Sequence, residues 1–195
     1  MLRTNCRKLD AIIFTHEHAD HTTGIDDVRP FFFRQGKIPI YIHKRVLSSL
    51  HERFAYIFDP KKKYPGAPDF EVNIISKDND FEVLGLNITP IESAHLKLPV
   101  LGYRIKNFAY LTDVKTISDI ELEKLKELDI LVINALRYEP HPSHFNLKKV
   151  FELVDIVRPK KTILTNMNNE IDYKEIKRLL PKNIMPAYDG MSFLI

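Results

Sequence analysis

The sequence predicts an α/β fold, in which short apolar strands alternate with amphipathic helices. Its 195 residues are enough for one domain with a substantial core, which we expect to span residues 1–195. Hydrophobic residues make up 44% and charged residues 28% of the chain, as in ordinary globular proteins. Two apolar runs, 11–14 and 130–133, and the mainly apolar run 162–164 have the length of buried strands.

The first third of the chain predicts two strands and two helices. The run 11–14 is a buried strand, and residues 24–34 form a short helix that ends near Gly36. Residues 38–42 form a second strand, which Pro39 places at the edge of a sheet. A helix over 44–54 and a loop over 58–69 follow. The loop contains three consecutive lysines, a pattern typical of a solvated surface.

The middle of the chain predicts closely spaced strands in an antiparallel meander. These strands cover 72–75, 81–84, 86–91, 101–105 and 108–111, within the range 70–111. Ser118 and Glu121 have the spacing of a capping box, which predicts a helix that extends to about Glu127.

The last third predicts two buried strands, two helices and a final strand. The strand 130–133 is apolar throughout, as expected for a strand covered on both faces, and 162–164 is another buried strand. Leu147, Val150, Phe151 and Val154 lie on one helix face, and a second helix covers 173–180. Asp189 and Gly190 predict a turn before the last strand.

The densest group of potential metal ligands is the stretch Thr-His-Glu-His-Ala-Asp-His over residues 15–21. It follows the first strand, and side chains two apart on an extended chain point the same way. His16 and His18 can therefore reach one metal ion, while Asp20 and His21 face a second position. This set suits zinc, manganese or iron. The alternative is a surface cluster that binds no metal.

His-x-His-x-Asp-His after a strand resembles the signature of the metallo-β-lactamase superfamily. Residues 24–30, 136–145 and 187–190 resemble the branch that contains the phosphoribosyl cyclic phosphate phosphodiesterases. The resemblance implies a four-layer αββα sandwich and a zinc- or manganese-dependent hydrolase with one or two ions per chain. In the family several strands precede the first motif, so it also implies a first sheet without its N-terminal strands. We therefore expect poor stability as a monomer, or pairing with another chain, for example as a homodimer.

Three further ligands follow from the same resemblance. His95 would complete the first metal site with His16 and His18, and Asp113 would bridge two ions. Asn166 stands where the family has a further histidine, and its amide oxygen is a weaker donor than imidazole. We therefore expect a second site that is weakened or that prefers manganese or magnesium over zinc, and nearer one tightly bound zinc than two. The alternatives are a buried structural role for His95 and a turn role for Asp113.

The resemblance also implies the residues that act on substrate. His144, as general acid, and Asp20 would carry catalysis, and Arg137, Arg29 and Asp27 would contact substrate. The expected reaction is hydrolysis of a small cyclic phosphate or phosphodiester by a metal-bound hydroxide. His144 could instead cap a helix, and the other three residues could form structural ion pairs. Rival functions are thioester or ester hydrolysis and metal binding without catalysis.

The charge and the cysteine content of the chain limit the kinds of substrate, partner and cellular compartment to be expected. A net charge of +3 favours a small anionic substrate and is too weak to argue for nucleic acid. No apolar run is long enough to span a membrane. The single cysteine, Cys6, excludes an internal disulfide and fits the cytoplasm. Residues 1–8 lack the apolar core of a signal peptide.

Overall fold

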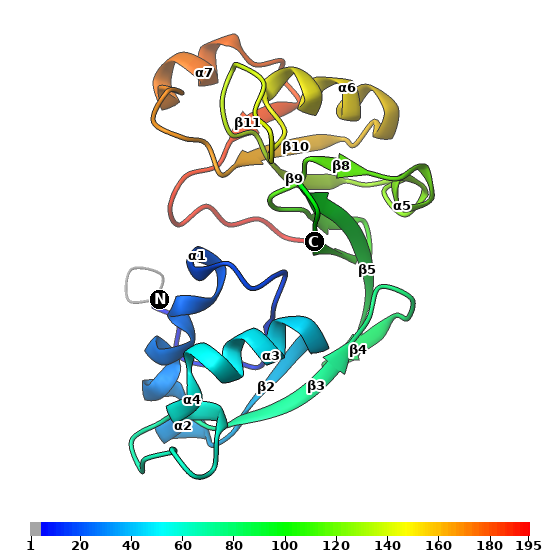
Figure 1. Cartoon of the computed structure of the whole chain (residues 1–195). Coiled ribbons are helices and arrows are strands. Elements are labelled where there is room, and N and C mark those ends of the chain that lie inside the picture. Colours follow the sequence, from blue (N-terminus) through cyan, green and yellow to red (C-terminus); the bar gives the residue numbers. More distant parts are fainter. Residues whose placement is uncertain (1–4) are drawn as a thin grey trace. The chain divides into compact units, whose positions relative to one another are not determined.

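The computed structural model describes residues 5–195. The statement above that residues 1–8 lack the apolar core of a signal peptide therefore concerns a segment whose first four residues lie outside the described range. The chain divides into two compact units, Met1–Ser76 and Lys77–Ile195, called here the N-terminal and C-terminal units. Within the described range each unit has its own sheet and its own helices, coloured by residue number in Figure 1. The predicted α/β class is therefore confirmed, and the single domain over residues 1–195 stays a prediction.

The N-terminal unit contains a parallel sheet with β2 (Ile38–His43) between β1 (Ile12–Ile13) and β3 (Phe70–Ile75). Alternate side chains of β2 are buried, as the two-residue period of a strand requires. The prediction that Pro39 marks an edge strand is wrong. The Tyr41 carbonyl accepts a hydrogen bond from Phe14 N, on the side of β2 that faces β1. Pro39 is two residues earlier, so its backbone nitrogen faces the same side. The pairing of β2 with β1 begins only at Ile40, so Pro39 has no β1 residue opposite it. A missing N–H therefore breaks no bond there.

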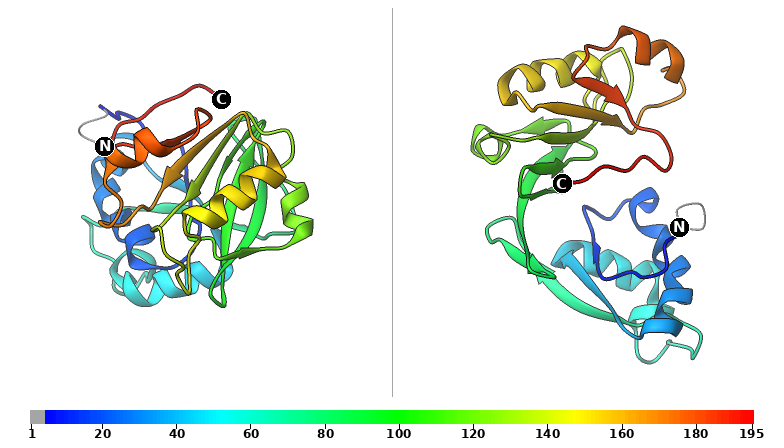
Figure 2. Two further views of the ribbon diagram at one scale, coloured as in Figure 1. Left: turned by 90° about the horizontal axis from the view of Figure 1, so that it is seen from above. Right: turned by 180° about the vertical axis from the view of Figure 1, so that it is seen from behind.

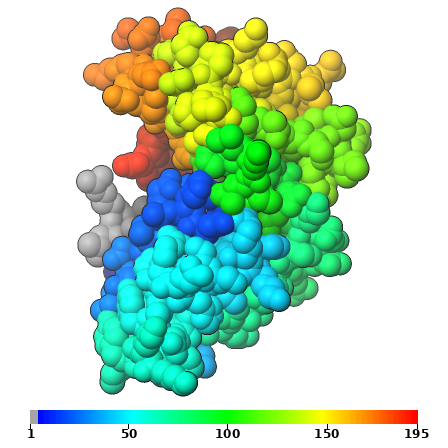
Figure 3. Space-filling model, in the orientation of Figure 1, coloured from blue at the N-terminus to red at the C-terminus, as the bar shows by residue number. Residues whose placement is uncertain are grey.

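Helices pack on this sheet. They are α1 (Ala19–Thr22), the 3₁₀ helix η1 (Thr23–Val28), α2 (Arg29–Gln35), α3 (Lys44–Arg53) and α4 (Ala55–Phe58). Val46 and Leu50 of α3 are fully buried in one core cluster with Ile40 of β2. The exposed side chains of α3 and α4 make up much of the cyan surface in Figure 3. Within residues 5–195, no helix combines the length and the apolar character needed to cross a membrane.

The C-terminal unit contains a mixed sheet in the order β11-β10-β9-β7-β6-β5-β4, with β8 paired to β5. Figure 2 shows this sheet from two further directions. Its strands are β4 (Phe81–Val83), β5 (Leu86–His95), β6 (Leu98–Ile105), β7 (Phe108–Tyr110), β8 (Thr116–Ile117), β9 (Ile130–Asn134), β10 (Lys161–Thr165) and β11 (Ile184–Pro186). The neighbouring strands β7, β9, β10 and β11 pair in parallel, so their carboxyl ends lie at the same edge of the sheet.

The predicted meander is confirmed from β4 to β7, which pair antiparallel in chain order. It is wrong for the strand at residues 72–75. That strand belongs to β3, which pairs in parallel with β2 in the other sheet. Close spacing along the chain predicts a strand but does not choose its partner, because a short connection can also pass from one sheet to another.

The helices of the C-terminal unit are α5 (Asp119–Glu123), α6 (Leu147–Val157) and α7 (Tyr173–Leu179). Along α6, Val150, Leu153, Val154 and Val157 are buried in the core cluster of the central strands. Burial of each such side chain contributes about 1.5–3 kcal/mol. This face fixes α6, and with it the connection from β9 that enters the helix.

Two predicted boundaries are wrong. The helix at Ser118 ends at Glu123, not near Glu127. After Glu123 the backbone hydrogen bonds join residues three apart, as in a 3₁₀ turn, and this tighter turn is followed by Leu125 and Leu128, which are buried in the core. The turn at 189–190 is present, but the strand β11 precedes it instead of following it. A turn signal alone does not tell on which side its strand lies.

Candidate functional site

Three histidines gather directly after β1. The ring centroid of His16 lies 4.7 Å from that of His18 and 4.3 Å from that of His21. His16 is buried, and His18 stands at the N-cap of α1, whose short helical turn brings His21 back toward His16. We call these residues the N-terminal histidine cluster. Its geometry agrees with the expectation that a strand end and the following turn collect these rings.

Helix α3 holds the backbone of this cluster. The Nη2 atom of Arg53 donates to the Glu17 carbonyl oxygen at 2.6 Å and to Thr22 Oγ1 at 3.1 Å. Thr22 Oγ1 in turn donates to the His18 carbonyl oxygen at 2.8 Å. Arg45, also on α3, pairs with the Glu17 carboxylate. Sequence reasoning did not find these two arginines, although both lie on the helix that follows β2.

Asp20 and Asp27, two further candidates in the N-terminal unit, have exposed side chains. Asp20 Oδ2 lies 3.2 Å from His21 Nε2, at the rim of the N-terminal histidine cluster. Asp20 is thus placed where a carboxylate can act together with an imidazole.

Arg29 donates three bonds to Asp26, from Nε to Oδ1 at 2.9 Å and from Nη2 to both carboxylate oxygens at 2.8 Å. Its guanidinium lies 5.4 Å from the Tyr64 ring centroid. The hydrogen bond with Asp26 raises the pKa of Arg29. These contacts correspond to the structural ion pair that the sequence left as an alternative for Arg29. The partner is Asp26, which sequence reasoning did not single out.

The C-terminal unit brings together four predicted residues from distant points of its chain: His95, Asp113, His144 and Asn166. His95 ends β5, Asp113 follows β7, His144 lies between β9 and α6, and Asn166 follows β10. His144 Nε2 lies 2.9 Å from Asp113 Oδ1, and Asn166 Nδ2 donates to the same oxygen at 2.8 Å. The His95 and His144 ring centroids are 4.4 Å apart. We call these residues the C-terminal polar cluster.

The backbone at the C-terminal polar cluster has an unusual conformation. Asp113 and Asn166 have φ angles of 53° and 51°, in the left-handed region that Asp and Asn tolerate better than most residues. Buried Asn134 braces the turn after Asp113: its Oδ1 accepts from Val114 N at 2.7 Å and its Nδ2 donates to Val114 O at 3.2 Å. Sequence reasoning missed Asn134, because an asparagine at the end of a strand occurs for many other reasons.

The neighbours of His95 determine which of its ring nitrogens carries the proton. His95 Nδ1 lies 2.8 Å from the Ser143 carbonyl oxygen. A carbonyl only accepts, so Nδ1 donates and a neutral His95 keeps the lone pair on Nε2. This is the arrangement that second-shell carbonyls impose on metal-binding histidines. The donor chemistry of His95 therefore fits a metal ligand.

His144 does not cap α6. The N-cap is Asn146, whose Oδ1 accepts from Lys149 N at 3.2 Å. The capping alternative for His144 is therefore wrong. The pKa of its neighbour His141 is lowered, first by burial and then by the charge of nearby His144.

Asn166 presents its amide nitrogen to Asp113 and donates a second bond to Thr112 Oγ1 at 3.1 Å. An ionised carboxylate has no proton to give, so the nitrogen must be the side of the amide that faces it. This orientation differs from the expected one, in which the amide oxygen of Asn166 is directed at a metal.

Arg137 has structural contacts of its own. Its Nη2 donates to Pro140 O at 2.8 Å, and its Nη1 lies 3.7 Å from Glu170 Oε1. These bonds tie the chain before His141 to the loop after β10. They correspond to the structural alternative that the sequence left open for Arg137.

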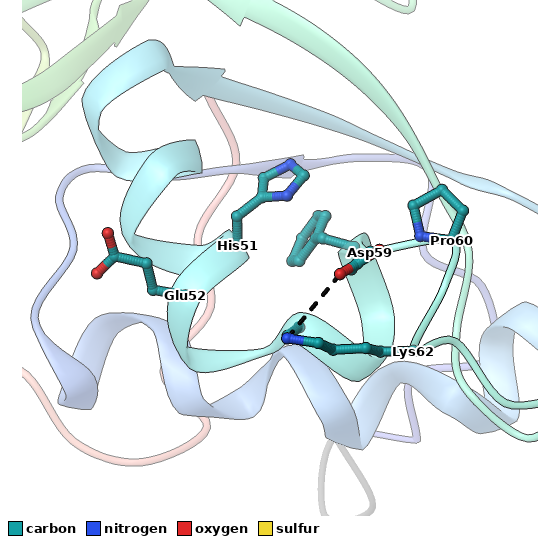
Figure 4. A pocket seen from close by; sticks show the side chains of 7 residues that line it. His51, Glu52, Asp59, Pro60 and Lys62 are labelled. Atoms are coloured by element: carbon teal, nitrogen blue, oxygen red, sulfur yellow. Dashed lines mark ion pairs between the residues drawn. The ribbon is translucent and has the colours of Figure 1, made fainter.

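A hollow of about 420 Å³ opens in the N-terminal unit between α3 and the chain after α4 (Figure 4). Lys62 pairs with Asp59 in it at 4.0 Å, and the His51 ring lies 5.1 Å from that of Phe58. A hollow of about 410 Å³ in the C-terminal unit lies along β5 and β8. Among the described residues that line the two hollows, no predicted site residue occurs.

Comparisons with known proteins agree with the motif. A family model described as beta-lactamase superfamily domain matches residues 2–167. An octanoyltransferase of Porphyromonas gingivalis is 35% identical over 189 residues, which are 96% of this chain and 38% of that protein. A beta-lactamase-like protein 2 homolog of Caenorhabditis elegans is 32% identical over 161 residues, 75% of this chain and 46% of that protein. The chain thus spans less than half the length of these curated relatives.

Solved structures match over nearly the whole chain. The crystal structure of a diphosphatase from the PhnP family is 34% identical with a TM-score of 0.88, and the match covers 97% of this chain and 72% of that one. The metallo-β-lactamase fold protein YhfI of Bacillus subtilis has a TM-score of 0.71 at 18% identity, covering 94% and 76% of the two chains. At that identity the second match concerns the fold alone, and it confirms the predicted metallo-β-lactamase architecture.

Proposed function

This chain belongs to the metallo-β-lactamase superfamily, and from that premise we propose that it is a metal-dependent hydrolase of small cyclic phosphates or phosphodiesters. The observation that carries the proposal is the C-terminal polar cluster, in which an imidazole, a carboxylate and an amide meet within hydrogen-bonding distance. The 34% identity to a PhnP-family diphosphatase supports a phosphorus ester as the substrate class.

We propose that the ligands of one ion are His16, His18 and His95, that Asp20 and His21 serve a second position, and that Asp113 contributes to both. The donor set supports zinc or manganese, which imidazole and carboxylate ligands accommodate. The lone pair left on His95 Nε2 by the Ser143 carbonyl supports the same assignment. A bound divalent cation at these ligands supplies Lewis acidity toward a phosphoryl oxygen and activates water near neutral pH.

His144 is the proposed proton donor to the leaving oxygen. Its Nε2 faces Asp113 Oδ1 at 2.9 Å, and because a carboxylate only accepts, Nε2 carries the hydrogen. The proton is therefore already directed into the cluster. Asp113 orients the ring through this bond, and Nε2 would exchange Asp113 for the leaving oxygen as it gives up the proton. Donation of this proton to the departing alkoxide is worth roughly 10²–10⁴-fold in rate.

Asn166 sets the proposed metal stoichiometry. Its nitrogen is engaged with Asp113 and Thr112, so it supports Asp113 and does not replace the histidine that the family has at this position. The second position then has fewer strong ligands than the first. We propose about one tightly bound ion per chain and a weaker second one.

One observation favours a second candidate function, hydrolysis of an acyl ester or thioester. The chain is 35% identical over 96% of its length to part of an octanoyltransferase, a protein named for acyl chemistry. The match covers 38% of that protein, so its name describes a much longer chain. A superfamily fold does not fix the substrate, and the two ester classes require separate assays.

The test is turnover of a substrate panel by the purified chain with added manganese or zinc. The panel contains a chromogenic phosphodiester, a cyclic nucleoside monophosphate and an octanoyl thioester. We expect hydrolysis of a phosphodiester or cyclic phosphate that stops after chelation and returns with the metal. Thioester turnover alone would establish the second candidate, and metal binding with no turnover would identify a protein that binds metal without catalysis.

A further inference from the structure

Ser143 contacts three histidine rings from the turn between β9 and α6, and it is buried. We propose that Ser143 is a positioning residue that directs two site histidines at once: its carbonyl sets the tautomer of His95, and its hydroxyl holds the ring of His144. The part that concerns turnover rests on the proposed function, whereas the part that concerns the tautomer does not.

The carbonyl of Ser143 acts on His95. The 2.8 Å contact with Nδ1 requires a hydrogen on that nitrogen, because the oxygen can only accept. In a neutral ring Nε2 then carries the lone pair, and the ring is fixed about its Cβ–Cγ bond. The main chain of Ser143 thereby prepares His95 as a ligand before any ion binds.

The hydroxyl of Ser143 acts on His144. Since His144 Nε2 donates to Asp113, its Nδ1 is an acceptor in the neutral ring, and Ser143 Oγ lies 3.0 Å from it. Oγ also lies 3.2 Å from His141 Nδ1, but that nitrogen already receives the backbone N–H of Ser143 at 3.3 Å. The hydroxyl hydrogen is therefore left for His144.

The two acceptor nitrogens strengthen this assignment. His141 Nδ1 and His144 Nδ1 lie 3.3 Å apart, so without a donor beside them two lone pairs would face each other. The Ser143 hydroxyl is the side chain that stands next to both. Without it the His144 ring would lose its Nδ1 partner and would turn away from its alignment with Asp113.

The turn that carries Ser143 is fixed to the Asp113 loop on both sides. Phe145 N donates to Val114 O at 2.6 Å, and Lys115 Nζ donates to His141 O at 2.5 Å. These bonds join the turn to the residues that directly follow Asp113. Ser143 therefore acts from a rigid frame, as a group that must hold a ring within a fraction of an ångström requires.

Ser143→Ala separates the two actions, because it removes the hydroxyl and keeps the carbonyl. We expect kcat on a phosphodiester to fall by about 10- to 100-fold, while KM and zinc affinity stay within about twofold. Ser143→Thr keeps a hydroxyl and should restore most of the rate. Ser118→Ala is the matched control: it removes the N-cap of α5, so it lowers stability and leaves kcat unchanged.

The second measurement is ¹⁵N NMR of the histidine rings in the metal-free full chain. We expect His95 to carry its proton on Nδ1, and we expect the Nδ1 signal of His144 to shift in Ser143→Ala. A proton on Nε2 of His95, or wild-type kcat in Ser143→Ala, would overturn the proposal. If the wild-type chain hydrolyses no phosphodiester, the proposed function fails, and the ring signals still decide whether Ser143 positions the two histidines.

Discussion

The two groups of candidate ligands are built in different ways. The N-terminal histidine cluster comes from one short stretch, and its rings meet because a strand ends and a helical turn begins. The C-terminal polar cluster comes from four segments that are distant along the chain: His144 and Asn166 bond to the same oxygen of Asp113, and the His95 ring packs against that of His144. The first is held mainly through its backbone by α3, whereas the second is held through its side chains.

This difference has an energetic consequence. Each side chain in the C-terminal polar cluster has a hydrogen-bond partner, so removing one leaves a buried group unsatisfied at a cost of about 1–3 kcal/mol. A substitution around the N-terminal histidine cluster alters the backbone that follows β1 and thereby lowers the affinity for a metal ion. We therefore expect loss of His144 to act mainly on catalysis and loss of Arg53, which holds the N-terminal histidine cluster, to act mainly on metal binding.

The largest effect is expected for His144→Ala. Loss of the proton donor should lower kcat on a phosphodiester by roughly 10²–10⁴-fold while the metal content stays that of the wild type. His51→Ala is the matched control, because His51 lies against Phe58 in the N-terminal unit and belongs to neither cluster. Steady-state kinetics and elemental analysis measure the two effects, and full turnover by His144→Ala would exclude the role of acid.

Arg53→Met tests whether α3 holds the N-terminal histidine cluster. The variant keeps an apolar stem and loses the bonds to Glu17 O and Thr22 Oγ1, so we expect zinc affinity to fall by about tenfold. Competition with a zinc-binding dye measures it. Arg34→Met is the control, since Arg34 bonds to the carbonyl of Arg7 at the surface. Equal zinc affinity in the two variants would show that Arg53 does not hold the N-terminal histidine cluster.

Asn166→His introduces the histidine that the resemblance implies for this position. Histidine tolerates a positive φ such as the 51° found here, and an imidazole is a stronger ligand than an amide. We expect the number of tightly bound zinc ions to rise from about one to about two per chain, as measured by elemental analysis after dialysis. Two equally tight ions in the wild-type chain would contradict the proposed supporting role of Asn166.

The smallest effect concerns His141 and pH. Burial, and then the charge of His144, lowers the pKa of His141, so below about pH 6.5 the unfolded chain binds the proton more readily than the folded one. The wild-type chain should therefore lose stability relative to His141→Asn as the pH falls from about 7 to about 5. Thermal melts measure this, and a difference in Tm that does not change with pH would contradict it.

The sequence predicts features formed by contiguous residues, and it does not predict which distant segments pair with one another. The strand at 11–14 and the histidines after it are contiguous, so their geometry follows from the two-residue period of a strand and the start of a helix. The apolar run at 130–133 was likewise sufficient for β9. The pairing of β3 with β2 and the position of β11 were predicted wrongly, because short segments do not encode their partners.

The same distinction holds for the site. His95, Asp113, His144 and Asn166 were named through a family resemblance, and the structure shows that they meet. The roles of Ser143, Asn134 and Arg53 depend on a backbone carbonyl, a buried amide and a helix position. Such roles have no sequence pattern, because serine, asparagine and arginine occupy many positions for other reasons.

The most direct test of the central claim is a zinc titration of the chelated wild-type chain beside His16→Ala and His95→Ala. The proposed function assigns His16 and His95 to the same ion. Each variant alone should therefore abolish the tight site and leave only binding weaker by at least about tenfold. If either variant keeps zinc affinity equal to that of the wild type, the two clusters do not share an ion and the proposed metal-dependent hydrolase is wrong.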